Sequence, residues 1–142
     1  MVDTGFPPFD TTIDKTNHVL KQIEQAYGWS KDQRNLSYHA LRAVMHTLRD
    51  RLPVDEAAQL AAQLPMLIRG IYYEGWDPSR VPVKLNREQF FDRVRQEFPY
   101  DVEGGPEQLA HTVPLALREH ISDGEWQDLK STLPRELVGV LP

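Results

Sequence analysis

Residues 40–76, ALRAVMHTLRDRLPVDEAAQLAAQLPMLIRGIYYEGW, decide the fold, because part of this stretch recurs later in the chain. Residues 48–71 align with residues 117–140 without a gap, at a shift of 69 positions. Repetition at a fixed spacing is typical of a duplicated structural unit. The seven identical pairs are Leu48/Leu117, Arg49/Arg118, Glu56/Glu125, Leu60/Leu129, Leu64/Leu133, Pro65/Pro134 and Gly70/Gly139.

Apolar residues in both segments recur every four positions, which places them on one face of a helix. The two clearest series are Leu36, Ala40, Val44, Leu48 and Leu52, and Leu109, Val113, Leu117 and Ile121. Pro65 and Pro134 each follow a leucine and lack the N–H that would continue a helix. Pro114 falls inside the second series, where it should bend the helix.

We therefore predict an all-α fold of two tandem three-helix repeats packed about a pseudo-twofold axis. The third helix of each repeat should be broken at its Leu-Pro step. Neither repeat can leave its apolar face exposed, so the two should share one core and form a single domain over residues 1–142. The expected segments are an extended arm at 1–11, a first repeat at 12–73, a linker at 74–85 and a second repeat at 86–142.

Four local patterns predict where helices begin, because a short polar side chain precedes an acid or amide by three positions. Thr11 and Asp14 indicate a first helix over 13–27. The other three are the capping boxes Ser30–Gln33, Asn86–Gln89 and Ser122–Glu125.

The composition excludes several classes of function. The chain has 142 residues, no cysteine and a net charge of −5, so disulfides and thiolate chemistry are excluded and nucleic-acid binding is disfavoured. The sequence contains no apolar run long enough to span a membrane and no basic-apolar secretory leader. We expect a cytoplasmic protein with no membrane association.

Several motifs resemble a bacterial family of helical proteins, the "domain of unknown function" family 2267. The resemblance covers residues 12–141 and implies a small, helical, cytoplasmic bacterial protein, without implying an activity. Pro114 is the position at which the chain departs most from it. The motifs are ALRAVMHTLRDRLP at 40–53, Glu56-Ala57, AQLP at 62–65, GIYY at 70–73, GWDP at 75–78 and the second Leu-Pro at 133–134.

Catalytic and metal-binding patterns are sparse. His39 and His46 share a helix face but lie about 10 Å apart along the axis, too far for one metal ion. No histidine pair has zinc spacing, and no nucleophile elbow or phosphate loop occurs. We expect surface or boundary histidines, no cofactor and no enzymatic activity.

Two glutamates occupy equivalent places in the duplication. Glu56 and Glu125 could approach each other across the pseudo-axis, and paired carboxylates can bind a cation or act as acid and base. The favoured interpretation is that each, at the third position of its helix, reaches back to the cap and offsets the helix dipole.

Arginines form a possible basic stripe on the second helix. Arg34, Arg42 and Arg49 are spaced eight and seven residues apart, which brings them to one face. Such a stripe can bind phosphates, but Asp32 and Asp50 dilute it. We favour a solvated, salt-bridged face.

The most function-like cluster is aromatic. Tyr72, Tyr73 and Trp76, with Asp77, end a helix beside a Gly/Pro-rich turn, a setting typical of a recognition patch or pocket mouth. The favoured alternative is that they cover the seam between the repeats.

These features lead to two functional hypotheses. The first is a non-enzymatic module that works by protein–protein contact, with a homodimer or another protein as the partner. The second is a small-molecule sensor or carrier, with a pocket between the repeats lined by Tyr72, Trp76, Phe90 and Phe91.

Overall fold

A computed structural model describes residues 2–142, and within this range every regular element is helical. The all-α prediction is therefore confirmed. The α-helices are α1 (Pro7–Tyr27), α2 (Arg34–Arg51), α3 (Val54–Gln63), α4 (Met66–Tyr73), α5 (Arg87–Glu97), α6 (Gly105–Leu117) and α7 (Asp123–Thr132). Short 3₁₀ turns are η1 (Lys31–Gln33), η2 (Pro78–Arg80), η3 (Arg118–His120) and η4 (Arg135–Leu137).

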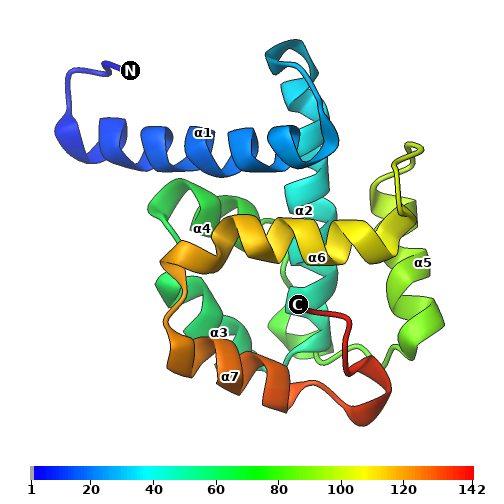
Figure 1. Cartoon of the computed structure of the whole chain (residues 1–142). Coiled ribbons are helices and arrows are strands. Elements are labelled where there is room, and N and C mark those ends of the chain that lie inside the picture. The colour runs from blue at the N-terminus through cyan, green and yellow to red at the C-terminus, as the bar shows by residue number, and fades with distance from the viewer. Residues whose placement is uncertain (1) are drawn as a thin grey trace.

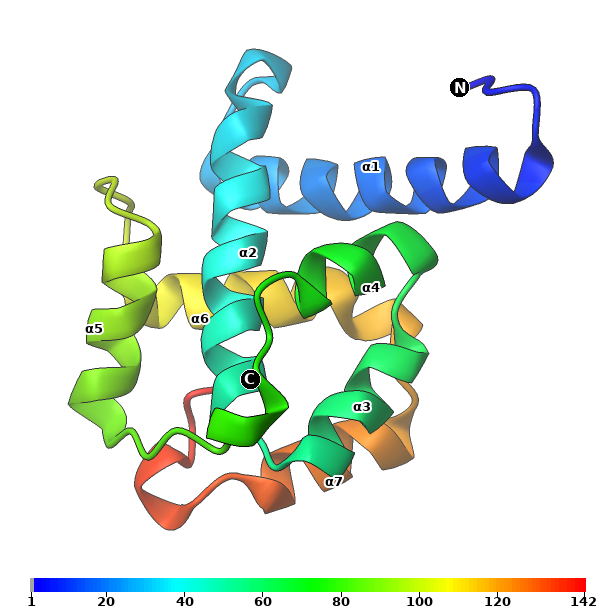
Figure 2. The ribbon, with the colours of Figure 1, turned by 180° about the vertical axis from the view of Figure 1, so that it is seen from behind.

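Helix α2 is the centre of the arrangement. It packs against α1, α4, α5 and α6, while α1 also contacts α4 and α6. Figures 1 and 2 show α1 and α6 crossing α2 at different heights, with α5 alongside its lower part. Helices α3 and α7 lie side by side at the other end of the molecule. Segments from both halves of the chain therefore surround α2.

The central position of α2 follows from its apolar residues. Ala43 and Val44 are wholly buried, and nearly every residue from Ala40 to Asp50 is shielded from solvent. Buried apolar side chains from all seven α-helices and from the C-terminal segment form one cluster around it. Burial of apolar area is the main favourable contribution to folding, so this shared cluster holds the helices together.

The first helix begins earlier than the sequence predicts. Residues 7–11, expected to belong to an extended arm, form the first turns of α1. Pro7 and Pro8 suit a helix start, because proline has its φ angle already set and needs no N–H in the first turn. Thr11 is thus not a cap: its hydroxyl donates to the Pro7 carbonyl within the helix.

The Leu-Pro steps break the chain as predicted. Helix α3 ends at Gln63 and α4 begins at Met66, and α7 ends at Thr132 before the turn η4. The capping boxes at Ser30 and Asn86 are present. Pro114, by contrast, does not end α6, which continues to Leu117 and passes into η3. No helix in residues 2–142 combines the length and apolar character needed to cross a bilayer.

Candidate functional site

An apolar groove lies between α1 and α4 on the surface of the molecule. Its volume is about 530 Å³. Phe9, Met66 and Leu67 are large apolar residues with exposed fractions of 51%, 50% and 40%. Exposed apolar residues gathered in one place mark a binding surface more often than scattered ones do. The residues that line this α1–α4 groove are Thr4, Phe9, Thr12, Ile13, Met66, Leu67, Gly70, Ile71 and Glu74.

The groove arises because α4 is apolar on more than one face. Ile68 and Tyr72 point into the core and are 1% exposed. Met66 and Leu67 occupy the opposite side of this two-turn helix and remain in contact with solvent. Within residues 2–142 no side chain covers the exposed apolar face formed by Met66 and Leu67.

A single hydrogen bond fixes the two walls relative to each other. The Leu67 N–H, one of the free donors in the first turn of α4, donates to the Thr12 hydroxyl of α1 at 2.8 Å. Thr12 is buried, and no intrahelical acceptor exists for this N–H. The contact therefore holds the start of α4 against α1 and keeps the groove open between them.

Acidic side chains surround a shallow hollow next to the groove. This acidic hollow, of about 380 Å³, lies at the N-terminal end of α1. It includes Asp3, Asp10 and Asp14. It adjoins the groove because Thr4, which lines the groove, donates its N–H to Asp10. The apolar groove is thus bordered by negative charge.

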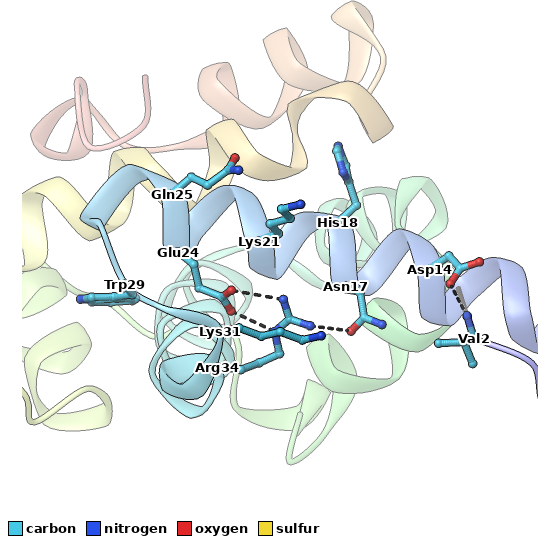
Figure 3. Close-up of a pocket in the computed structure, with 10 residues that line it drawn as sticks. All are labelled: Val2, Asp14, Asn17, His18, Lys21, Glu24, Gln25, Trp29, Lys31 and Arg34. Carbon is cyan, nitrogen blue, oxygen red and sulfur yellow. Dashed lines mark hydrogen bonds and ion pairs between the residues drawn. The ribbon is translucent and has the colours of Figure 1, made fainter.

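A separate polar pocket, of about 480 Å³, lies between α1 and the segment that leads into α2 (Figure 3). Arg34 donates two hydrogen bonds to the Glu24 carboxylate, at 3.0 and 3.2 Å, and a third to Asn17. Burial alone would raise the pKa of Glu24, but hydrogen bonds from Arg34 and Ser37 outweigh it and lower this pKa below its ordinary value. The pair Glu24–Arg34 is therefore a structural ion pair that joins α1 to α2.

The predicted basic stripe does not form a free surface. Arg34 is paired with Glu24, and Arg42 with Glu74 and the Tyr38 hydroxyl. Arg49, expected on a solvated face, is 3% exposed. All three arginines stabilise the fold, so none is available to bind phosphates.

Arg49 belongs to a buried polar network instead. Its Nε lies 2.8 Å from the Asp50 carboxylate, which also pairs with Arg93 of α5. Its Nη1 donates to the carbonyls of Tyr72 and Glu74, both at 2.8 Å. These carbonyls belong to the C-terminal end of α4, which lacks intrahelical donors. Arg49 therefore caps α4 from α2.

The aromatic cluster is divided between core and surface. Tyr72 is buried and its hydroxyl donates to the Ala57 carbonyl at 2.9 Å. Tyr73 and Trp76 are half-buried and pack together, with ring centroids 5.2 Å apart. Asp77 accepts hydrogen bonds from Ser79, which lower its pKa and form the turn η2. None of the four residues of this cluster is among those that line the groove.

Three of the four residues expected to line a pocket between the repeats are buried. Tyr72 and Phe90 are 1% and 0% exposed, and Phe91 is also buried. Phe90 and Phe91 pack edge to face at 5.7 Å. These three side chains are part of the core, whereas Trp76, the fourth residue of the expected lining, is partly buried and packs against it.

The histidines are dispersed. His46, expected at the surface or at its boundary with the core, is buried because α2 is enclosed on several sides. Its Nε2 lies 2.7 Å from the Ile71 carbonyl and therefore donates. Burial lowers the pKa of His46, which favours the neutral ring. Within residues 2–142, no three His, Cys, Asp or Glu side chains are grouped closely enough to hold a metal ion.

The fold and the groove together define an all-helical protein with an unpartnered apolar surface. A family model described as an uncharacterized conserved protein, DUF2267, matches residues 16–139. The chain therefore belongs to this family, and the resemblance of its sequence motifs is confirmed. None of the curated proteins compared with the chain matches it.

Proposed function

We propose that this protein is a non-enzymatic interaction module whose α1–α4 groove docks an amphipathic helix of a partner protein. The observation that carries the proposal is the exposure of Phe9, Met66 and Leu67 on facing walls of one groove. A groove between two helices accepts the apolar face of a third helix, a recurring mode of peptide recognition.

The charges beside the groove favour a basic occupant. Asp3, Asp10 and Asp14 form the acidic hollow that adjoins the groove, whereas Glu74, which also lines the groove, is paired with Arg42. Charges opposite to these on the partner would steer association, whereas like charges oppose it. A second copy of this chain would bring its own acidic hollow to the contact. A partner helix with lysines or arginines beside its apolar stripe fits better.

The test uses two model peptides and the full-length protein. Both peptides form amphipathic helices with the same leucine face; one carries lysines on its polar face and the other glutamates. We expect the lysine peptide to bind, measured by fluorescence anisotropy, and to slow amide exchange in α4 and in the first half of α1. The glutamate peptide should bind at least tenfold more weakly.

Two double variants distinguish binding in the groove from nonspecific binding to exposed apolar residues. Met66→Gln with Leu67→Gln should abolish binding without unfolding the protein, because both side chains are exposed. Leu115→Gln with Val138→Gln removes two exposed apolar residues elsewhere and should leave binding unchanged. Equal binding of both peptides, or binding unaffected by the groove variant, would overturn the proposal. If sedimentation equilibrium shows a dimer and the groove variant is a monomer, the occupant of the groove is a second copy of this chain and not a basic helix.

We also propose that the two halves are a duplicated three-helix unit related by a pseudo-twofold axis. The contacts among these six helices support this. If α1, α2 and α3 are exchanged with α5, α6 and α7, every contact among the six becomes a contact that is also present. Thus α1–α2 becomes α5–α6, and α1–α6 becomes α5–α2. Superposing residues 13–72 on 86–141 tests the proposal: the helices should overlay pairwise, and failure to do so would refute it.

A further inference from the structure

Two buried carboxyl groups meet where α3 packs against α7. Glu56 and Glu125 are the third residues of these helices and are only 7% and 8% exposed. The Glu56 side chain is within hydrogen-bonding reach of the Glu125 side chain. Ionised carboxylates in such contact repel each other, so the arrangement needs a physical explanation.

Neither glutamate caps its own helix, contrary to the favoured interpretation of the sequence. The residue at the cap of α3 is Pro53, which has no N–H for Glu56 to accept. At α7 the Ser122 N–H donates to Gln63 of α3 at 2.9 Å, so it is not free for Glu125. Only the other half of that box forms, with the Ser122 hydroxyl accepting from the Glu125 N–H. Both side chains are therefore free to turn toward each other.

Two further acidic side chains lie near the pair. Glu56 Oε1 and Glu125 Oε2 are buried and have no other hydrogen-bond partner within residues 2–142. The groups that face Glu56 are Asp55 on its own helix, Asp128 on α7 and the Tyr72 phenol on α4. Burial, followed by the hydrogen bond and the negative charge of Glu125, raises the pKa of Glu56 to about 7.

We propose that Glu56 and Glu125 hold one proton between them, and that release of this proton loosens α3 from α7. With the proton bound, one carboxyl group donates its O–H to an oxygen of the other, and the pair carries a single negative charge. When the proton leaves to solvent, two negative charges face each other in a buried contact with Asp55 and Asp128 nearby. The pair is therefore a proton-sensitive latch between the two halves of the chain.

The sign of the effect follows from linkage. A carboxyl group whose pKa is higher in the folded state than its ordinary value of 4.5 stabilises the fold fully below that value. This stabilisation is lost as the pH rises through about 7. Burial of His46 acts in the opposite sense, because a lowered histidine pKa reduces stability as the pH falls. The test must separate the two, and it does not depend on the groove.

The direct measurement is a carbon NMR titration of the glutamate side-chain carboxyl carbons in the full chain. We expect the side-chain carboxyl resonance of Glu56 to titrate near pH 7. This corresponds to proton binding about 300-fold tighter than at an ordinary glutamate. A titration step of Glu56 near its ordinary value of 4.5 would overturn the proposal.

Variants then connect the proton to the helix contact. Glu56→Gln supplies a permanent N–H donor to Glu125. The free energy of unfolding of wild type, measured relative to that of this variant, should therefore fall between pH 6 and pH 8. Amide exchange in α3 and α7, corrected for intrinsic rates, should accelerate at pH 8 in wild type but not in Glu56→Gln. Glu107→Gln, at an exposed site on α6, is the matched control and should follow wild type. Identical pH profiles for wild type and Glu56→Gln, or a shift of both carboxyl resonances on adding millimolar calcium or magnesium, would overturn the latch.

Discussion

The Arg49 guanidinium lies 2.8 Å from the carboxylate of its chain neighbour Asp50, and both side chains are buried in the centre of the molecule. Adjacent residues on a helix normally diverge. Here the long arginine side chain bends back so that one group holds Asp50 and the end of α4 together. A charged pair is thus buried beside the apolar series of α2, where the sequence predicts a solvated face.

Removing the Arg49 guanidinium should be strongly destabilising. Arg49→Met leaves two carbonyls of α4 without this donor and leaves Asp50 with Arg93 as its remaining partner. We expect a loss of about 3–5 kcal/mol in the free energy of unfolding, measured by urea denaturation. Arg95→Met, at an exposed pair with Asp92, should cost less than about 1 kcal/mol. Similar losses in both variants would contradict the buried role of Arg49.

Two neighbouring tyrosines offer a matched comparison of one hydroxyl group. Tyr72→Phe removes a buried hydrogen bond to Ala57 and should lower the free energy of unfolding by about 1 kcal/mol. Tyr73→Phe should change it by less than about 0.5 kcal/mol, because its ring is only half-buried. Thermal denaturation of the two variants side by side gives the difference. Equal effects would mean that the Tyr72 hydroxyl does not join α4 to α3.

The two faces of α4 should separate stability from binding. Ile68→Ala empties a site that is 1% exposed and should cost about 2–5 kcal/mol. Leu67→Ala, at a 40% exposed site in the groove, should cost less than about 1 kcal/mol yet weaken binding of the lysine peptide. Urea denaturation and anisotropy together measure both quantities. A large stability loss from Leu67→Ala would place that side chain in the core rather than in a binding surface.

The ion pair between Glu24 and Arg34 should make stability fall in acid. The pKa of Glu24 is lowered in the folded state, so its contribution is present above its ordinary value of 4.5 and is lost as the pH falls toward the lowered value. At neutral pH, Glu24→Gln should cost about 1.5–3 kcal/mol, because a buried hydrogen-bonded charge is removed. Once the pH has fallen through this lowered pKa, the variant and wild type should converge. A difference that stays constant from pH 7 to pH 3 would contradict this role for Glu24.

The helices were predictable where their apolar spacing is long and regular. The series from Leu36 to Leu52 coincides with α2, and the Leu-Pro steps coincide with breaks in the chain. The start of α1 was missed because Thr11 and Asp14 imitate a cap, while Pro7 is itself a good first residue. The pattern at Thr11 and Asp14 thus favoured a helix start later than the observed start at Pro7.

The candidate site was only partly predictable. Met66 and Leu67 were recognisable as apolar positions of the continued third helix, but spacing alone does not show which face of so short a helix stays uncovered. Arg49 was assigned to solvent because charge usually indicates a surface, and the carbonyls that draw it inward are not visible in sequence. Pro53 was a sequence signal for the pairing of Glu56 with Glu125, because Pro53 has no N–H that the Glu56 side chain could accept.

The packing of α1 on α6 and of α3 on α7 has a consequence for how the chain can be cut. Each of these contacts joins a helix before residue 74 to one after residue 85, so a break in this connection leaves two pieces that each expose half of a common interior. Neither piece should fold alone, but the two expressed together should reassemble.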